Sequence, residues 1–491
     1  MKIMMFETPT LERDGSVPFG VLYAASSVFR EGHDVKIIDL VKNEYSYIEL
    51  RNIIIDFAPD LIGMGGITSS YKNCKALVKN IKNDFRQLPI VAGGVISSVS
   101  DLLLKSVGVD YIVHGEGEKT FPELVNAIEH GKSVSEISGI SFLDKERIVR
   151  TAQREQIERL DDIPMPHYEL LDMEKYLEPA EKWFQRYFSQ DIEAFELMGD
   201  RAKGKRFLFP IITARGCTHK CIFCYRHHKG LRQHSVPYVI SMMKHLHEKY
   251  QVDVFQINDE LTTGNRQWVM EFCDAIIHSD MDILMIVLSA RVDTVDEEIL
   301  TRLREAGCIM INYGYESGSD IMLKEIRKGV SRDQALKAGL LTKKIGIKSV
   351  PEIIIGFPSE TNNTVDETID FLKRLDTWPI SVNTPIPFPE TTLWKYAIEK
   401  NLISDKEDFV SNYRRGLFVN FTKYSDLKVQ FFVTKVKYET LLHWLKRRKK
   451  YCEYFITYIK CIFLLYVKPV LPNRINKIIQ LLYFKLSNTS V

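Results

Sequence analysis

The sequence predicts an α/β protein built from two regions of alternating strands and helices, followed by a helical extension. Short apolar runs alternate with amphipathic stretches of helical length near the start of the chain, and the alternation returns at residue 207. Residues 136–206, between the two regions, lose this alternation. We therefore expect a first domain at 1–135, a linker at 136–206, a second domain at 207–425 and a helical extension at 426–491.

Five apolar runs in the first region predict the strands of a parallel sheet. They are Lys2–Phe6, Val35–Asp39, Leu61–Met64, Pro89–Ala92 and Tyr111–Val113. The stretches between them have helical spacing and can serve as crossovers, which predicts a doubly wound, flavodoxin-like sheet. Ligands of such sheets bind beyond the carboxyl ends of the strands.

Glycines follow three of these strands. They are Gly65 and Gly66, Gly93 and Gly94, and Gly115 and Gly117. Glycine permits a positive φ and lets the backbone approach a bulky ligand closely. An ordinary strand-to-helix turn explains any single one of them. Three glycine-rich loops on one rim predict a ligand site.

The second region carries six further strand candidates. They are Phe209–Ala214, Val252–Asn258, Ile283–Ser289, Ile309–Tyr315, Lys348–Ile355 and Ile380–Pro385. Six parallel βα units predict a partial (βα)6 barrel, in which the chemistry lies at the carboxyl ends of the strands.

Composition limits the classes of function and location. The 491 residues carry 66 Lys plus Arg against 64 Asp plus Glu, so the net charge of +2 creates no broad field that would attract nucleic acid. Only three of the eight cysteines cluster, which argues against a disulfide framework. The short apolar run before Glu7 is not a secretory signal, so we expect a cytoplasmic protein.

Three cysteines follow the first predicted barrel strand with the spacing CxxxCxxC: Cys217, Cys221 and Cys224. Three thiolates suit a soft metal, and on a 4Fe-4S cube they leave one iron open to bind a small molecule and pass it an electron. The alternative is a structural zinc site completed by one of three histidines, His219, His227 or His228. Structural zinc normally stabilises small loops. The position of the three cysteines at the mouth of a predicted barrel therefore favours an iron-sulfur cluster.

The segment Arg215-Gly216-Cys217-xxx-Cys221-x-Phe223-Cys224 resembles the signature of the radical S-adenosylmethionine superfamily. The preceding domain resembles the cobalamin-binding domain of one large subfamily. The resemblance implies a 4Fe-4S cluster that reductively cleaves S-adenosylmethionine to methionine and a 5'-deoxyadenosyl radical. It also implies that Phe223 lies by the adenine of S-adenosylmethionine.

Later segments resemble the other cofactor-binding segments of the barrel. The resemblance implies that Asp259 binds the amino group of S-adenosylmethionine, although Asn258 stands where an aspartate is more usual. Arg291 would meet the carboxylate through its planar fork of donors. Glu316 would accept hydrogen bonds from the ribose hydroxyls.

Two segments near the end of the barrel complete this comparison. Gly356 lies in the segment whose backbone is implied to run beside the adenine. In Pro387–Thr392, Glu390 replaces the usual glycine, which puts the last cofactor contact in doubt.

The first domain lacks the Asp-x-His-x-x-Gly pattern by which some cobalamin proteins offer a histidine to cobalt. We therefore predict cobalamin binding in residues 1–135 without histidine ligation. The alternative is a domain that keeps the fold and has lost the cofactor.

These observations predict a cobalamin-dependent radical S-adenosylmethionine enzyme. The expected activity is methyl transfer to an unactivated carbon of a small-molecule or lipid-like biosynthetic intermediate, with an electron donor such as flavodoxin or ferredoxin. A radical cyclase or rearrangement enzyme is the alternative within the family. A non-catalytic cobalamin- or zinc-binding regulator is the alternative from another class, and cleavage of S-adenosylmethionine separates it from an enzyme.

The extension contains five consecutive basic residues, 446–450, followed by a stretch rich in aromatic and apolar residues. Glu453 and Lys460 interrupt that stretch, so it does not predict a spanning helix. A helical cap and an anchor at an anionic membrane surface are both compatible with this pattern. Peripheral membrane contact is therefore an alternative location.

Overall fold

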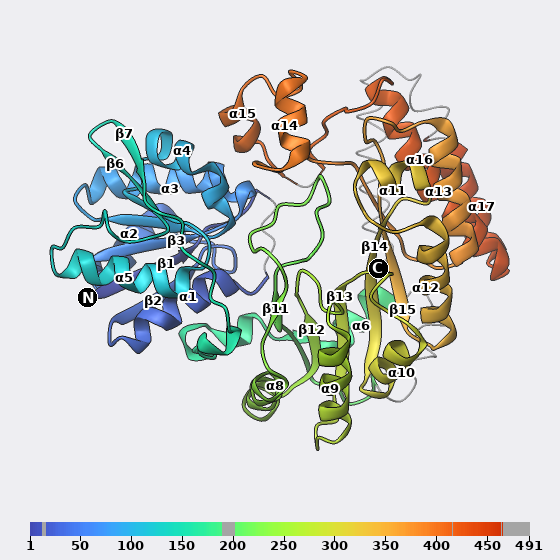
Figure 1. The fold of residues 1–491 in the computed structure, drawn as a ribbon, viewed down its shortest axis with the longest axis horizontal. Helices are drawn as coiled ribbons and strands as arrows, with labels where there is room; N and C mark the ends of the chain where they lie inside the picture. Colours follow the sequence, from blue (N-terminus) through green and yellow to red (C-terminus); the bar gives the residue numbers. More distant parts are fainter. Residues whose placement is uncertain (12–15, 189–201, 415, 463, 465–491) are drawn as a thin grey trace. The chain divides into compact units, whose positions relative to one another are not determined.

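The computed structural model describes residues 1–11, 16–188, 202–414, 416–462 and 464. The chain forms two compact units, and Figure 1 labels their elements. Unit 1 comprises Met1–Ala290, Glu298–Ile309 and Pro387–Leu417, and unit 2 comprises Arg291–Glu297, Met310–Ile386 and Phe418–Val491.

Unit 1 begins with a seven-stranded sheet in the order β2-β1-β3-β4-β5-β6-β7. Its parallel strands are β1 (Lys2–Glu7), β2 (Asp34–Asp39), β3 (Leu61–Gly65), β4 (Ile90–Gly93) and β5 (Tyr111–Val113). The five predicted strands are thus present. The sheet continues with an antiparallel hairpin, β6 (Ile140–Asp144) and β7 (Arg147–Arg150), which falls in the predicted linker.

Helices cover both faces of this sheet. Side chains alternate between the two faces along each strand, so the buried apolar strands contribute to a core on each face. Ile3 and Met5 of β1 pack with residues of α1 (Phe19–Arg30) and α5 (Gly117–Glu129). Met4 and Phe6 pack on the other face, against α2 (Tyr47–Phe57) and α3 (Tyr71–Asp84). The shorter helices of this region are η1 (Thr68–Ser70), η2 (Val95–Val99), α4 (Ser100–Leu102) and η3 (Leu103–Val107).

The connection to the barrel strands contains little regular structure but is partly buried. Ile157, Leu160 and Ile163 pack around Tyr23 of α1. Its elements are η4 (Leu160–Asp162), η5 (Tyr168–Leu170), η6 (Met173–Lys175), β8 (Glu178–Pro179) and α6 (Ala180–Phe188). The connection is therefore a packed part of unit 1.

Three parallel barrel strands complete unit 1: β9 (Phe207–Ile211), β12 (Val252–Ile257) and β13 (Leu284–Ala290). The two-stranded ribbon β10 (Ala214–Arg215) and β11 (Arg232–Gln233) follows β9. The helices here are α8 (Val236–Tyr250), α9 (Arg266–Ile277), α10 (Glu297–Glu305), α14 (Thr392–Glu399) and α15 (Lys406–Ser411).

Unit 2 continues the βα alternation with three parallel strands, β14 (Cys308–Glu316), β15 (Lys348–Ile354) and β16 (Ser381–Asn383). Its helices are α11 (Asp320–Glu325), α12 (Arg332–Lys344), α13 (Asn362–Leu375), α16 (Asp426–Arg447) and α17 (Tyr451–Ile462). All six strands predicted for a partial barrel are present. The expected fold class is therefore confirmed.

Local sequence signals explain where several of these helices begin. Ser46 caps α2 and Ser331 caps α12, each in a reciprocal pair with the residue three positions later. Such a capping box satisfies two backbone donors that a helix end leaves without partners. Pro237 stands in the first turn of α8, where a backbone N–H would have no partner within the helix, so its missing N–H has no cost there.

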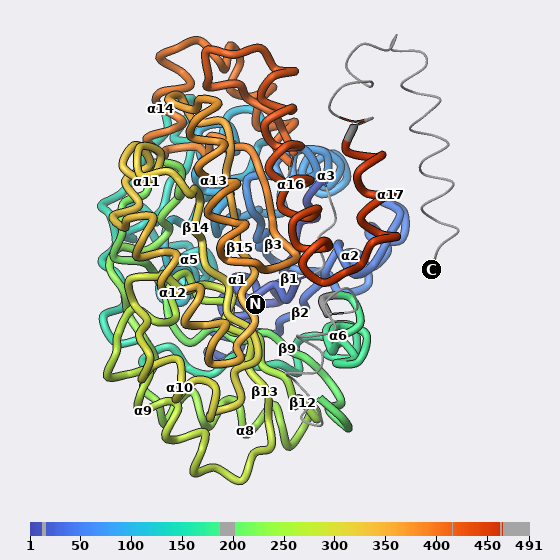
Figure 2. The backbone as a smooth tube through the Cα atoms, turned by 90° about the vertical axis from the view of Figure 1, so that its right-hand side faces the viewer, coloured from blue at the N-terminus to red at the C-terminus, as the bar shows by residue number. Residues whose placement is uncertain are grey.

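The helical extension is present up to α17, which packs against α16 (Figure 2). The predicted extension beyond residue 464 lies outside the described residues. No helix in the described part of the chain has the length and apolar character needed to cross a bilayer.

Candidate active site

A cavity of ≈ 410 Å³ lies at the carboxyl edge of the first sheet. All six predicted glycines line it: Gly65, Gly66, Gly93, Gly94, Gly115 and Gly117. The loop after β10 contributes His227 and His228, and β10 itself contributes Arg215. The predicted glycine-rich loops and the residues that flank the cysteine motif thus line the same cavity.

The loops after β3 and β4 meet backbone to backbone at this rim. Gly94 has a φ of +80°, and a Cβ atom there would stand 3.3 Å from the Gly66 carbonyl oxygen. The same oxygen accepts a hydrogen bond from the Ile96 N–H at 3.0 Å. A side chain at position 94 would therefore be strained and would crowd the rim.

The cysteine motif lies in a hairpin whose two ends meet through backbone contacts. Ala214 and Arg215 pair antiparallel with Gln233 and Arg232, and Cys217 forms a bridge with Lys229. Between them, Gly216 has a φ of +87°.

Gly216 is the residue on which this closure depends. A Cβ atom at position 216 would stand only 2.1 Å from the Gly230 carbonyl oxygen. Real Cβ atoms do not approach a backbone oxygen so closely, and glycine alone accepts this φ without strain. The glycine before the first cysteine is thus required for the two ends of the loop to meet.

The three predicted metal ligands lie on this loop. Cys217 and Cys221 are half-buried, Cys224 is exposed, and all three are thiols rather than disulfides. The Cys224 N–H donates to the Cys221 carbonyl at 3.3 Å, which bends the loop into a turn. Phe223 lies half-buried in the same turn.

The donor set of this loop fits an iron-sulfur cube. Among the described residues, no three His, Cys, Asp or Glu side chains converge on the position of a single metal ion. A 4Fe-4S cube takes each thiolate on a different iron, so three cysteines on one loop would hold three irons and leave the fourth open.

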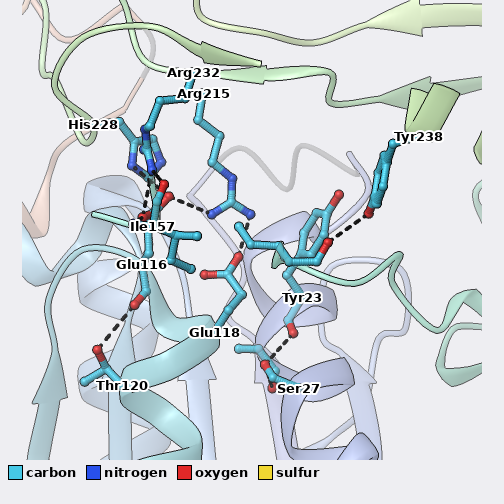
Figure 3. Close-up of polar contacts among 12 residues, drawn as sticks. Tyr23, Ser27, Glu116, Glu118, Thr120, Ile157, Arg215, His228, Arg232 and Tyr238 are labelled. Atoms are coloured by element: carbon cyan, nitrogen blue, oxygen red, sulfur yellow. Dashed lines mark hydrogen bonds and ion pairs between the residues drawn. The ribbon is translucent and has the colours of Figure 1, made fainter. Parts of the chain in front are cut away.

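A buried ion-pair cluster joins the hairpin to the rim of the first sheet (Figure 3). Glu116 accepts hydrogen bonds from Arg215 Nη1 at 3.1 Å and from Arg232 Nη1 at 3.0 Å. The Ile157 N–H donates to Glu116 Oε2 at 2.7 Å, and Arg215 Nη2 donates to Glu118 Oε1. Both strands of the hairpin are thus tied to the loop after β5.

The charges of this cluster compensate one another. The side chains of Arg215, Glu116 and Arg232 are 10%, 4% and 14% exposed. Burial alone would raise the pKa of Glu116, but hydrogen bonds from Arg232 and Ile157 and the charge of Arg215 hold it below its ordinary value. The guanidinium of Arg215 also lies over the Tyr23 ring, 5.1 Å from its centroid.

Two neutral imidazoles face the cavity from the hairpin. Burial lowers the pKa of His228 to about 3, and burial also lowers that of His227. The buried Nδ1 of His228 makes no hydrogen bond within the described part of the chain and stands 3.8 Å from Glu116 Oε1. The absence of histidine ligation to cobalt stays a prediction.

Asp259 is anchored to the start of the cysteine hairpin, and its contact with S-adenosylmethionine stays a prediction. Its carboxylate accepts hydrogen bonds from the Thr213 N–H at 2.7 Å, the Thr213 hydroxyl at 2.6 Å and the Ala214 N–H at 2.9 Å. The residue is 5% exposed, and burial raises its pKa to about 6. Its neighbours Asn258 and Glu260 line the cavity at the glycine rim. Asp259 therefore positions the start of the cysteine hairpin.

Unit 2 links Arg291 and Glu316 through a lysine that sequence reasoning missed. Arg291 pairs with Asp293 at 2.9 Å and donates to the Lys328 carbonyl at 2.7 Å. The Lys328 ammonium in turn pairs with Glu316 Oε1 at 2.8 Å. Lys328 lies outside the strands, beside Gly329. A lysine in such a loop is normally solvated, but Lys328 is only 6% exposed.

Two predicted sites of unit 2 have a positive φ, and a buried carboxylate holds one of them. Glu316 has a φ of +63°, which is uncommon for a residue with a side chain. Gly356 has a φ of +117°, and its N–H donates to the buried carboxylate of Glu360 at 3.0 Å. The sequence offered no signal that Glu360 would fix this turn.

Comparison with known proteins agrees with this arrangement. Residues 15–125 match the model of the B12 binding domain, and residues 211–372 match that of the radical SAM superfamily. An uncharacterized methyltransferase, PH0819, of Pyrococcus horikoshii is 33% identical over 82% of this chain and 84% of its own length. The anaerobic magnesium-protoporphyrin IX monomethyl ester cyclase of Synechocystis sp. is 27% identical over 82% of this chain and 78% of its own.

A solved structure has the same fold. The radical S-adenosylmethionine methyltransferase TsrM from Kitasatospora setae, with cobalamin and a 4Fe-4S cluster bound, aligns with a TM-score of 0.65. The two chains are 18% identical, and the alignment covers 81% of this chain and 75% of TsrM.

The cavity fits a bulky cofactor such as cobalamin, because glycines at its rim let the backbone approach a ligand closely. The expected cofactors are confirmed as a 4Fe-4S cluster, S-adenosylmethionine and cobalamin. From these matches and the extent of the similarity to the P. horikoshii protein, the chain belongs to the cobalamin-dependent radical S-adenosylmethionine enzymes.

Proposed function

We propose that this chain is a methyltransferase that acts on an unactivated carbon of a small biosynthetic intermediate. The observation that carries the proposal is the ion pair between Arg215 and Glu116, which fixes the cysteine hairpin beside the glycine rim in unit 1. The name of the P. horikoshii relative supports the same activity.

When bound, the cofactors supply a carbon radical and a methyl group. The residues of the chain hold and orient them and exclude water. Cys217, Cys221 and Cys224 hold three irons of the cluster. Gly216 lets the hairpin close, and the Glu116 cluster holds it against the rim. Glu260 lines the cavity beyond the hairpin, and burial raises the pKa of its carboxyl.

A second candidate is a radical cyclase, which the similarity to the Synechocystis cyclase favours. Both activities need a reductant, and we assign this role to a donor of the flavodoxin or ferredoxin type. The substrate of the enzyme would be a small or lipid-like molecule in either case.

The products made from S-adenosylmethionine distinguish the candidates. Anaerobically reconstituted protein with cobalamin and a strong reductant should form both 5'-deoxyadenosine and S-adenosylhomocysteine, because a methyltransferase removes the methyl group from one cofactor molecule and cleaves another. A cyclase forms 5'-deoxyadenosine alone. A non-catalytic regulator forms neither, and the Cys221→Ala variant provides the matched blank for both products.

A further inference from the structure

Helix α17 of unit 2 turns an apolar face towards solvent. Phe455 and Ile459, one helical turn apart, are 63% and 53% exposed. The exposed apolar and aromatic side chains of the helix are Tyr451, Phe455, Ile456, Tyr458 and Ile459. At about 3.6 residues per turn these positions fall within one arc of about 160°. The helix thus presents a continuous apolar surface, unlike the single exposed apolar residues that are normal on a protein surface.

The other side of α17 packs on α16, which lies beside it (Figure 2). On this side Tyr454 is half-buried and Cys461 is buried. The Tyr458 ring stacks on that of Tyr454, with the ring centres 6.2 Å apart, and is thereby held at the edge of the apolar face. The two charged residues of the helix, Glu453 and Lys460, are exposed and lie outside the apolar arc. One side of α17 therefore caps the unit, and the apolar side stays open to solvent.

Cations are concentrated where the chain turns from α16 into α17. Residues 446–450 are all Lys or Arg. The guanidinium of Arg448 and the ammonium of Lys450 lie over the Trp444 ring, 4.5 and 5.4 Å from its centre. Asp376 lies 3.1 Å from Arg448 and is shared with Arg447, so this one carboxylate does not balance the basic run. The exposed cations of the run are Lys446, Arg447 and Lys449.

An apolar helix face beside a cluster of cations fits the headgroup region of an anionic membrane. An amphipathic helix lies in that region with its apolar side chains inserted and its basic residues among the headgroups. Tyrosine suits this depth, because its ring is apolar and its hydroxyl reaches water. Each Lys or Arg near an anionic surface adds to the attraction.

A protein partner fits this surface less well. A stable protein interface takes about 800 Å² and about 20–30 residues from each partner. The apolar face of α17 offers five side chains. Insertion into a membrane needs no such area, because the apolar side chains and the cations each add to the binding.

We propose that α17 binds the surface of membranes that contain anionic phospholipids. The apolar face of the helix inserts below the headgroups, and Lys446, Arg447 and Lys449 contact the phosphates and carboxylates of the lipids. The inference goes beyond the proposed function and does not depend on it, since none of these residues belongs to the cavity or to the cysteine loop. Such a contact would hold the enzyme where lipid-like molecules are concentrated.

The test measures how the full-length protein sediments with vesicles of two compositions. One is phosphatidylcholine alone, and the other is an equal mixture of phosphatidylcholine and phosphatidylserine. At low salt the protein should bind the mixed vesicles at least about tenfold more tightly, because three exposed cations face the anionic lipid. The difference should shrink at high salt, which screens exposed charges.

Two substitutions in the centre of the apolar face test the insertion. Phe455→Ser combined with Ile459→Ser should weaken binding to the mixed vesicles by about tenfold or more, because both side chains leave the inserted surface. The matched control combines Ile48→Ser with Ile55→Ser, two exposed apolar residues of α2 that are 72% and 47% exposed. This control should bind as the wild type does. Circular dichroism checks that each variant is folded.

A second pair of variants tests the cations. Lys446→Gln combined with Lys449→Gln should weaken binding to the mixed vesicles by about tenfold at low salt and have little effect at high salt. The control combines Lys72→Gln with Lys79→Gln, which removes the same charge from exposed positions on α3. It should leave the binding unchanged, since it alters only the net charge.

Three results would overturn the inference. The first is a wild type that binds neither kind of vesicle, or binds both equally at low salt. The second is wild-type binding by the variant with Phe455→Ser and Ile459→Ser, which would place the contact elsewhere in the chain. The third is a dimer, seen by analytical ultracentrifugation, that the same variant abolishes, which would make this face an interface between copies. Because cleavage of S-adenosylmethionine is measured without vesicles, a failure here is distinguishable from a failure of the proposed function.

Discussion

Arg215 Nη1 donates to Glu116 Oε1 at 3.1 Å, and this contact joins the residue two positions before the first cysteine to the rim that carries the glycines. Arg232, on the opposite strand of the hairpin, binds the other oxygen of the same carboxylate. One glutamate thus holds both strands. The position of the cysteine loop relative to the cavity depends on this buried cluster.

Arg215→Met should destabilise unit 1 by about 3–5 kcal/mol, because it leaves the carboxylates of Glu116 and Glu118 buried with less compensation. Denaturant unfolding under anaerobic conditions measures the loss. Arg159→Met is the matched control, since Arg159 and Asp162 form an exposed pair at 3.8 Å that should contribute little. Equal losses in the two variants would mean that the cluster does not stabilise the unit.

Gly216→Ala should prevent the hairpin from closing, because its Cβ would stand 2.1 Å from the Gly230 carbonyl oxygen. We expect reconstituted protein to retain less than about half of the iron of the wild type. Gly230→Ala is the control, because it also has a positive φ but its Cβ would meet nothing within 4 Å. It should lose only about 1 kcal/mol of stability and keep its iron.

Replacement of Cys217, Cys221 and Cys224 by Ala should remove all of the roughly four irons that the anaerobically reconstituted protein carries. Cys452→Ala, which changes an exposed cysteine of α17, should leave the iron content unchanged. Metal analysis after production in iron-rich anaerobic medium gives the answer. Stoichiometric zinc with little iron would identify the structural zinc site instead.

The sequence predicts those features that repeat or that need a rare residue type. The strands appear as apolar runs, and the glycine rim and the cysteine loop each need residues that few others can replace. Asp259 shows what such a pattern misses. Only the folded backbone reveals that Thr213 and Ala214 donate hydrogen bonds to its oxygens, and its contact with S-adenosylmethionine stays a prediction. The burial of Lys328 was missed because a single charged residue carries no signal of burial.

Lys328→Met should weaken the binding of S-adenosylmethionine by about tenfold, since its ammonium holds Glu316 and its backbone carbonyl holds Arg291. The buried Glu316 carboxylate would lose its countercharge and turn away. Equilibrium dialysis of the clustered protein measures the affinity. Lys324→Met is the control, because Lys324 is an exposed residue of α11. Unchanged affinity in Lys328→Met would show that Glu316 keeps its position without the lysine.

The stability of the hairpin should depend on pH through His234, whose N–H bonds to the Thr213 carbonyl and whose ring stacks on Tyr238 at 4.1 Å. Burial lowers the pKa of His234 to about 4, although a hydrogen bond to Asp161 opposes the shift. The unfolded chain therefore binds a proton below about pH 6.5, whereas the folded chain does so only near pH 4.

The free energy of unfolding should accordingly be constant above about pH 6.5 and fall by up to about 1.4 kcal/mol per pH unit between there and pH 4 from this residue alone. His234→Gln keeps a side-chain donor that does not titrate, so urea unfolding at pH 7.5 and 5.5 should show a smaller fall than in the wild type. His130→Gln, at an exposed histidine, should leave the fall unchanged. Equal falls in all three proteins would mean that His234 does not stay neutral in the folded state.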